Sequence, residues 1–177
     1  MVITELDKFP KLQKRILLEG LREFWEAPLR RAEGRHVYQA DWFRLYKIFL
    51  DYFGVEPETL RRAYRGDRQA RNELASPRAA ASRALRQLIG RALVQRARDK
   101  EARERRKYWQ LTLQGVAVAR ALFPQEKGDP ELIPKLKEIY ETRSGREKRL
   151  PPWEEFYALC TYDHNAGQKK SGSEHKQ

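Results

Sequence analysis

The sequence predicts a mainly helical fold that contains one small antiparallel β-hairpin. Apolar residues recur at helical spacing in five segments, residues 12–25, 40–53, 76–90, 113–123 and 132–140. Between the third and the fourth of these segments the period changes, because the sequence there is rich in residue types that favour strands. With 177 residues, the chain is long enough for one principal domain and an appendage.

The N-terminal part is expected to contain two helices with a short strand between them. The first apolar stripe, residues 12–25, should form a helix that ends at Pro28, because proline disrupts a helix interior. Residues 36–38 are expected to form a short strand that pairs with the hairpin. Residues 40–53 are expected to form a second helix, which Gly54 would end.

Residues 76–90 carry the signals of a complete amphipathic helix. Ser76 can accept the hydrogen bond of an N-cap, Pro77 suits the first helical position, and Gly90 offers a natural end. The expected inward stripe consists of Ala81, Ala84, Leu85, Leu88 and Ile89. The opposite side carries Arg78, Ser82, Arg83 and Arg86. One face should therefore pack against the protein, and the other should be cationic.

Residues 93–97 and 108–113 are expected to form the two strands of a hairpin with a charged tip. Thr112 can then cap a further helix over residues 113–123. The basic residues of the hairpin are Arg96, Arg98, Lys100, Arg103, Arg105, Arg106 and Lys107, and they outnumber Asp99, Glu101 and Glu104. Such a tip suits contact with a nucleic-acid backbone or minor groove, and the alternative is a solvated loop whose charges partly cancel.

Residues 125–163 are expected to form a helical C-terminal extension. The apolar stripe at residues 132–140 needs a surface that covers it, which we expect to be either a homodimer contact or the first helix. A small apolar segment, residues 153–159, follows Pro151 and Pro152. Residues 164–177 are rich in Gly, Ser and Lys, and we expect a disordered tail there.

The charge balance favours a polyanionic partner. The chain has 37 Lys and Arg against 25 Asp and Glu, which gives a formal net charge of +12. The excess is mostly arginine, which can fork onto a phosphate or a guanine edge. An Arg-rich and Ala-rich composition can also reflect genome base composition. We favour a nucleic-acid partner because the excess surrounds the helix at residues 76–90 and the hairpin.

Other classes of function find little support in the sequence. Cys160 is the sole cysteine, so an internal disulfide is impossible, and Cys160 with His164 is expected to be an incidental pair rather than a metal site. We find no phosphate-binding glycine loop and no convincing catalytic nucleophile, and we expect neither a cofactor nor enzymatic activity. No apolar stretch approaches the ~20 residues that span a bilayer, and no signal peptide is evident. We therefore expect a cytoplasmic protein.

One phrase of the sequence resembles a known family. Ser-Arg-Ala-Leu-Arg-Gln-Leu-Ile-Gly-Arg-Ala-Leu-Val, residues 82–94, is followed by the hairpin and by Leu-Thr-Leu-Gln-Gly, residues 111–115. This pattern resembles the recognition helix and wing of prokaryotic winged helix-turn-helix regulators of the broad MarR-like type. The resemblance covers roughly residues 11–123, and its specific part is residues 76–115.

The resemblance implies a winged helix-turn-helix domain over residues 1–124 that binds double-stranded DNA. It implies a non-enzymatic, nucleoid-associated transcriptional regulator, expected to be dimeric, whose recognition helix enters the major groove. By match to the family motif, the expected base-edge or sugar contacts are Arg78, Ala79, Ser82 and Arg83, and Arg86 is an expected phosphate contact. The alternative for this helix is an ordinary amphipathic helix with a solvated arginine face.

The chain departs from the family pattern at residues 55–75, which stand where a tight turn of a few residues is usual. Leu60, Ala63 and Tyr64 are the expected inner side of an extra helix that begins near Pro57. Its outward side carries Arg61, Arg62, Arg65, Arg68 and Arg71. This segment is either an insertion or the positioning helix itself, in which case residues 40–53 form an additional helix.

Two further functions remain open. The first is a DNA-binding adaptor of a phage, plasmid or replication system, which would recruit a protein partner through the C-terminal extension. The second is RNA binding by a winged domain. Exposed tryptophans can stack on bases, as they do in proteins that bind single strands. The tryptophans of this chain lie within apolar stripes, so they are expected to pack in the core.

Overall fold

The computed structural model describes residues 8–97, 107–147 and 150–161. The helical elements are α2 (Lys11–Ala32), η1 (Val37–Gln39), α3 (Tyr46–Asp51), α4 (Pro57–Tyr64), α5 (Arg68–Glu73), α6 (Ala75–Gly90), α7 (Leu113–Leu122), η2 (Ile133–Lys135), α8 (Leu136–Ser144) and α9 (Trp153–Thr161). The strands β1 (Val94–Ala97) and β2 (Tyr108–Leu111) form a two-stranded antiparallel sheet. The chain is thus mainly helical with a small hairpin, as the sequence predicts.

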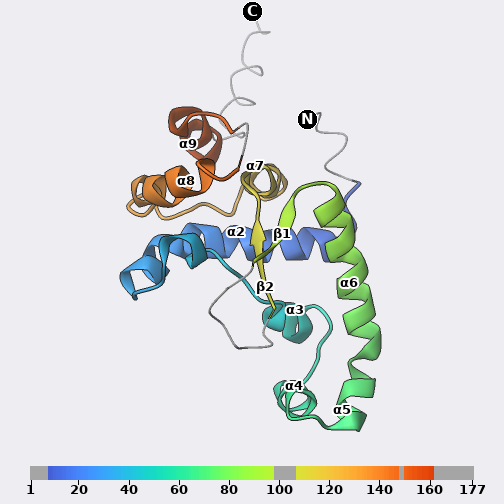
Figure 1. The fold of residues 1–177 in the computed structure, drawn as a ribbon. Coiled ribbons are helices and arrows are strands. Elements are labelled where there is room, and N and C mark those ends of the chain that lie inside the picture. Colours follow the sequence, from blue (N-terminus) through green and yellow to red (C-terminus); the bar gives the residue numbers. More distant parts are fainter. Residues whose placement is uncertain (1–7, 98–106, 148–149, 162–177) are drawn as a thin grey trace, which may run out of the picture.

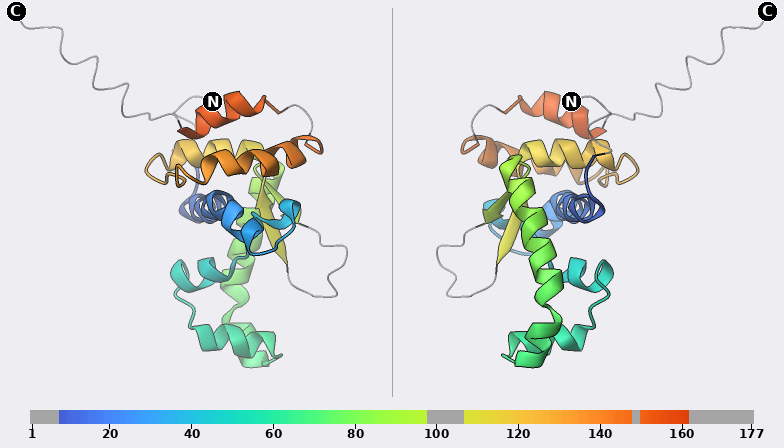
Figure 2. Two further views of the ribbon diagram at one scale, coloured as in Figure 1. Left: turned by 90° about the vertical axis from the view of Figure 1, so that its left-hand side faces the viewer. Right: turned by 90° about the vertical axis from the view of Figure 1, so that its right-hand side faces the viewer.

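Helix α2 lies at the centre of the molecule. Helices α7, α8 and α9 lie on one side of it, and the hairpin crosses it (Figure 1). The C-terminal end of α6 packs against α2. The N-terminal end of α6 lies away from the body, beside α4 and α5 (Figures 1 and 2). The start of α6 therefore projects beyond the central layers.

The main core is the apolar cluster that surrounds α2. Helix α2 buries Ile16, Leu17, Leu21 and Phe24 completely. Strand β2 lies so close to α2 that a Cβ atom at Gly20 would stand 2.6 Å from the Cγ of Leu111. Gly20 therefore permits the close approach of helix and hairpin.

A second, smaller apolar cluster supports the start of α6. Its buried members are Leu60, Ala63, Ala70 and Leu74, and we call it the satellite core. Partly buried side chains of α3 and its flanks pack against this cluster. Helix α6 therefore begins on the satellite core and ends in the main core, to which it contributes Ala84, Leu85 and Leu88.

The helix predicted over residues 76–90 is confirmed as α6, but both of its ends differ in detail from the prediction. It begins at Ala75, and Leu74 occupies the N-cap position, so Ser76 is not the N-cap. It ends at Gly90, but the residue with the left-handed conformation is Ala92, at φ 56°. The N–H of Leu93 donates to the carbonyl of Leu88 at 2.9 Å, which completes the turn. Ile89, expected on the inward stripe, is 41% exposed.

The predicted hairpin and the helix after it are confirmed. In the hairpin, Val94 pairs with Leu111 and Ala97 pairs with Tyr108. The side chain of Thr112 accepts a hydrogen bond from the N–H of Gly115 at 2.9 Å, so Thr112 caps α7 as predicted.

The segment before α3 corrects two predictions. Residues 36–38 do not form a strand, because η1 occupies Val37–Gln39. The expected helix over residues 40–53 is reduced to α3. The reason is a β-bridge between Phe43 and Trp109. The N–H of Phe43 donates to the carbonyl of Trp109 at 2.8 Å, and the N–H of Trp109 donates to the carbonyl of Phe43 at 2.9 Å. A backbone engaged in this bridge is not available to a helix. Gly54, at φ 64°, follows α3 as the predicted stop.

Two further predictions about the first helices are wrong. Helix α2 does not end at Pro28 but continues to Ala32, because Phe24, Trp25 and Ala27 hold this part of it in the main core. The extra helix near Pro57 exists as α4, with Leu60 and Ala63 buried as predicted, but Tyr64 is 63% exposed.

The C-terminal helices pack on the chain itself. Helix α8 contacts α2 and buries Leu136, Ile139 and Tyr140, so the apolar stripe predicted at residues 132–140 is covered by the first helix. Helix α9 packs on α7 and α8, and the centroids of the Tyr140 and Phe156 rings lie 4.5 Å apart. The expected disordered tail, residues 164–177, lies outside the described residues. Among the helices that the structure describes, none is both long and apolar enough to cross a bilayer.

The four tryptophans pack within the protein, as expected. Trp25 and Trp42 are buried, and Trp109 and Trp153 pack against the main core.

Candidate nucleic-acid interface

The outer face of α6 is the cationic surface that the sequence predicts. Its exposed residues include all five expected contacts, Arg78, Ala79, Ser82, Arg83 and Arg86. From Leu74 to Ala97 the chain has no Asp or Glu, and it carries Arg91 and Arg96 in addition to the arginines of α6. No acidic residue of this segment therefore offsets its positive charge.

The arginines of α6 differ from many others in the molecule in having no acidic partner among the described residues. Elsewhere, Arg22 contacts Glu126 at 2.6 Å and Arg62 contacts Asp67 at 2.7 Å. Within the described part of the chain, by contrast, Arg78, Arg83 and Arg86 form no ion pair. Their guanidinium groups are accordingly available to an anionic ligand.

The helical spacing divides the residues of α6 outside its inward stripe among three directions. At 100° per residue, Ala79, Arg83 and Arg86 lie near the middle of the exposed face. Arg78 lies on the flank that lines a surface depression between α6, α3, α4 and β2. Gln87 lies on the other flank, where it accepts a hydrogen bond from Gln13 of α2. Residues of the central direction point away from the protein body, as a groove-reading surface requires.

The hairpin supplies further basic residues beside α6. Arg96 of β1 and Lys107, just before β2, are exposed. The remaining basic residues expected at the tip are Arg98, Lys100, Arg103, Arg105 and Arg106, and they lie outside the described residues. Lys107 and Arg78 line the same surface depression, so helix and hairpin each contribute a basic group to it.

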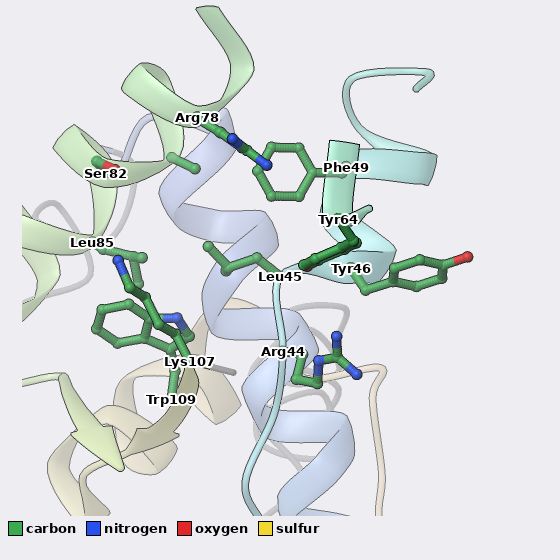
Figure 3. Close-up of a pocket in the computed structure, with 11 residues that line it drawn as sticks. Arg44, Leu45, Tyr46, Phe49, Tyr64, Arg78, Ser82, Leu85, Lys107 and Trp109 are labelled. Carbon is green, nitrogen blue, oxygen red and sulfur yellow. The ribbon is translucent and has the colours of Figure 1, made fainter. Parts of the chain in front are cut away.

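That depression is a hollow of about 550 Å³ between α3, α4, α6 and β2, which we call the α3–α6 hollow (Figure 3). Leu45, Phe49, Leu85 and Trp109 form much of its apolar lining. Arg44, Arg78 and Lys107 provide cationic groups, and Tyr46, Tyr64, Ala81 and Ser82 complete it. In Figure 3, Arg78 extends toward the ring of Phe49, and Lys107 lies beside Trp109. No local pattern in the sequence predicts this hollow.

The basic residues of α4 and α5 are less available than those of α6. Arg61 contacts Glu58 at 3.2 Å, and the Nε of Arg71 donates to the carbonyl of Ala63. Asp67 caps α5 by accepting a hydrogen bond from the N–H of Ala70. That hydrogen bond, together with the guanidinium of Arg62, lowers the pKa of Asp67. Several of these arginines thus serve the local structure, while Arg65 and Arg68 remain exposed without an ion pair within the described chain.

A buried polar cluster holds the hairpin in place. The side-chain amide of Gln110 donates to Asp41 at 2.7 Å, and Gln95 donates to Gln110 at 2.9 Å. Arg143 of α8 donates to Asp41 at 2.6 Å and also to Glu147 at 2.7 Å. This cluster is not among the features predicted from the sequence. The signal for it was the position of Arg143, which follows Leu136 and Ile139 at helical spacing and so stands on the inward stripe of α8.

Among the described residues, no group of three or more His, Cys, Asp and Glu side chains is arranged to hold a metal ion. Cys160 belongs to α9, while its side chain and His164 lie outside what the structure describes.

Comparisons of the chain with protein-family models, with curated proteins and with solved structures found no match. The inference of function accordingly depends on the residues and their geometry.

Proposed function

We propose that this chain is a non-enzymatic, sequence-specific double-stranded DNA-binding protein, a prokaryotic transcriptional regulator of winged helix-turn-helix type. In this proposal α6 enters the major groove and the hairpin lies on the backbone or in the minor groove beside it. The observation that carries the proposal is the outer face of α6, where Arg78, Arg83 and Arg86 are exposed and have no acidic partner within the described chain. Such a face suits a polyanion and offers donors to base edges.

The order of elements supports the winged-helix part of the proposal. Helix α6 leads directly into the hairpin, and the bridge between Phe43 and Trp109 stands where a third strand would pair. The satellite core joins α3, α4 and α5 at the start of α6. We propose that these short helices together take the place of a single positioning helix.

The dimensions of α6 suit insertion into DNA. Its 16 residues correspond to a length of about 24 Å, and its first turns project from the body (Figure 1). The major groove, about 12 Å wide, admits a helix with side chains of this kind. In the proposed complex Arg78 or Arg83 would contact guanine, each contributing about 1–3 kcal/mol of discrimination between bases.

The proposed dimer needs a surface other than the stripe of α8, because α8 is packed against α2. A dimer would read a roughly palindromic site through two copies of α6. The mass of the protein in solution, with and without DNA, tests this part of the proposal separately.

The proposal is tested by selection from a randomised duplex pool, followed by fluorescence anisotropy on the enriched duplex, a scrambled duplex, a single strand and a duplex RNA. We expect an enriched motif, tighter binding to it than to the scrambled duplex, and a steep dependence on salt concentration. Preference for RNA would replace the proposal with RNA binding. Binding without an enriched motif would favour the adaptor, whose partner would then be sought through the C-terminal helices.

A further inference from the structure

We propose that a row of aromatic side chains beside the hairpin is a second binding site, on which the bases of a single-stranded nucleic acid stack. The row consists of His36, Tyr38, Trp42 and Tyr108, and we call it the aromatic row. It is separate from the outer face of α6. The inference therefore goes beyond the proposed function and does not depend on duplex binding.

The rings of the aromatic row contact one another in succession. The rings of His36 and Tyr38 are stacked, with their centroids 5.5 Å apart and an angle of 16° between their planes. The ring of Trp42 follows, with its centroid 6.4 Å from that of Tyr38 and 5.6 Å from that of Tyr108. The row thus leads from the residue before η1 to the first residue of β2.

Three of the four rings are accessible from solvent. His36 is exposed, and Tyr38 and Tyr108 are half-buried. Trp42, only 8% exposed, is the member that anchors the row in the protein. Aromatic rings that are held in place and partly uncovered are the groups on which single-strand binders stack bases, and they accept any base because every base has a π-face.

Two arginines beside the aromatic row are available to the phosphates of a strand. The Cζ of Arg146 lies 5.4 Å from the centroid of the Tyr38 ring, and Arg35 directly precedes His36. Both arginines are exposed, and neither forms an ion pair within the described chain. The acidic residues of the neighbouring segments are already paired with other arginines, namely Glu33 with Arg30, Glu138 with Arg31, and Asp41 and Glu147 with Arg143. Rings flanked by unpaired guanidinium groups favour a nucleic acid over an apolar or a cationic ligand.

The hairpin separates the aromatic row from α6. The ring of Tyr108 contacts Trp42, whereas Trp109, the next residue of β2, lines the α3–α6 hollow beside α6. Successive side chains of a strand point to opposite faces, so the row and α6 lie on opposite sides of the hairpin. Figures 1 and 2 show the segment that follows α2 on one side of the hairpin and α6 on the other. A strand on the row would consequently leave the outer face of α6 free.

The site is tested by fluorescence anisotropy of the full chain with a labelled thymidine oligonucleotide of about 12 nucleotides, a length usual for one single-strand site. The control probe is an abasic oligomer of the same length, which has the same phosphates without the bases. We expect the thymidine oligomer to bind about tenfold more tightly, because stacking adds to the phosphate contacts. A uridine oligomer of the same length shows whether the preferred strand is DNA or RNA. Equal affinity for the base-bearing and the abasic oligomers would overturn the proposal.

Variants locate the site on the molecule. His36→Ala and Tyr108→Val each remove one accessible ring and should reduce the preference for the base-bearing oligomer about fivefold. Tyr52→Leu removes a tyrosine that is 42% exposed outside the row, and this matched control should leave the preference unchanged. Thermal unfolding followed by circular dichroism establishes that each variant is folded. A wild-type preference in both row variants would refute the site.

The ring of His36 also reports binding directly. The chain has three histidines, so the His36 ring protons can be assigned in the NMR spectrum by their absence from His36→Ala. Their chemical shift should change when the thymidine oligomer is added and should stay the same with the abasic oligomer. The same shift with both oligomers, or with neither, would contradict stacking on the row.

Arg83→Gln and an enriched duplex separate this inference from the proposed function. Arg83→Gln should weaken duplex binding and leave the preference for the base-bearing oligomer intact. A saturating amount of the enriched duplex should leave the thymidine oligomer bound, and its displacement would show that the two sites are not separate. If the row variants lose the base preference but no duplex motif is enriched, the aromatic row stands and the proposed function fails. If a duplex motif is enriched and no base preference exists, the reverse holds.

Discussion

Arg143 of α8 forms a buried ion pair with Asp41, at 2.6 Å, across 102 positions of the chain. The two side chains are only 4% and 1% exposed. Arg143 also donates to the backbone carbonyl of Leu111, and Gln110 donates to Asp41. The pair and its hydrogen bonds thus join α8 and the loop before α3 to the hairpin. They fix the position of β2, which lines the hollow.

Replacing Arg143 with Met should lower the free energy of unfolding by about 3–5 kcal/mol, because Asp41 would remain buried without its partner. The double variant Asp41→Asn, Arg143→Met should lose less than the sum of the two single variants. Urea unfolding of the four proteins measures both quantities.

The control for this cycle is Arg31→Met, which removes an exposed ion pair with Glu138 at 3.4 Å. An exposed pair contributes at most about 1 kcal/mol. Equal losses from Arg31→Met and Arg143→Met would show that the buried cluster does not stabilise the fold.

The elements predicted correctly from sequence are those whose signals are local. The apolar stripe of α6, the strand-forming runs of the hairpin and the Thr112 cap all lie within a few residues of the structure that they specify. The exposure of the arginines on α6 follows from the same stripe, so this part of the candidate site was predictable.

The features that sequence analysis missed depend on distant partners. Phe43 lies in an apolar run that predicts a helix, but its backbone pairs with Trp109. Asp41 and Gln110 look like surface residues until Arg143 is placed beside them. The α3–α6 hollow is formed by side chains from several elements, and no local pattern encodes the space between them.

The satellite core should control the stability of the first turns of α6. Leu60 is 3% exposed in this cluster, and Leu60→Ala should weaken it by about 2–5 kcal/mol through the cavity that it leaves. We expect faster hydrogen exchange in α4, α5 and the first half of α6, with the amides of α2 much less affected. Exchange followed by NMR measures this difference.

As a comparison, Leu17→Ala removes a fully buried side chain of the main core and should accelerate exchange in the whole domain. If Leu60→Ala produced the same uniform pattern, the two cores would form one cooperative unit.

Two arginines of α6 should have separable effects on DNA binding. Arg83→Gln should weaken binding to the enriched duplex much more than binding to the scrambled one, because Arg83 is proposed to contact bases. Arg86→Gln should weaken both duplexes alike and reduce the salt slope by about 0.9, the effect of one lost phosphate contact. Anisotropy across a salt series distinguishes the two.

Arg31→Gln, a charge removal on α2, is the matched control for both variants and should leave duplex discrimination intact. If Arg83→Gln lowered the affinity for the enriched and the scrambled duplex equally, Arg83 would not be a base contact.

Substitutions at the C-terminal end of α6 should stabilise the protein. Ala92 adopts a left-handed conformation that costs a residue with a Cβ atom about 1 kcal/mol, so Ala92→Gly should raise the free energy of unfolding by a similar amount. Gly90 ends the helix, and a Cβ atom added there would meet no other atom within 4 Å, so Gly90→Ala should add about 0.5–1 kcal/mol. Thermal or urea unfolding gives both values, and a loss of stability from Ala92→Gly would contradict the assigned turn.

The pair of Arg22 and Glu126 should make stability depend on pH. The hydrogen bond from Arg22 lowers the pKa of Glu126 below its ordinary value of 4.5. The stabilisation is therefore complete above this value and is lost as the pH falls through the lowered pKa of the folded protein. Because both side chains are partly exposed, we expect its size to be at most about 1 kcal/mol.

Glu126→Gln should consequently be less stable than the wild type near neutral pH, and the difference should shrink on acidification. Urea unfolding at a series of pH values measures it. Glu131→Gln, at an exposed position without an ion pair in the described chain, is the control. A difference for Glu126→Gln that stays constant with pH would exclude the charged form of Glu126 as its cause.

The division of α6 between two apolar cores bears on how the protein can diverge. Leu60, Ala63, Ala70 and Leu74 cluster apart from the main core, so substitutions among them need no compensating change around α2. Descendants of this chain could therefore alter the tilt and the exposed residues at the start of α6 while keeping the same central scaffold. Selection on the target and selection on folding would then act on different sets of residues.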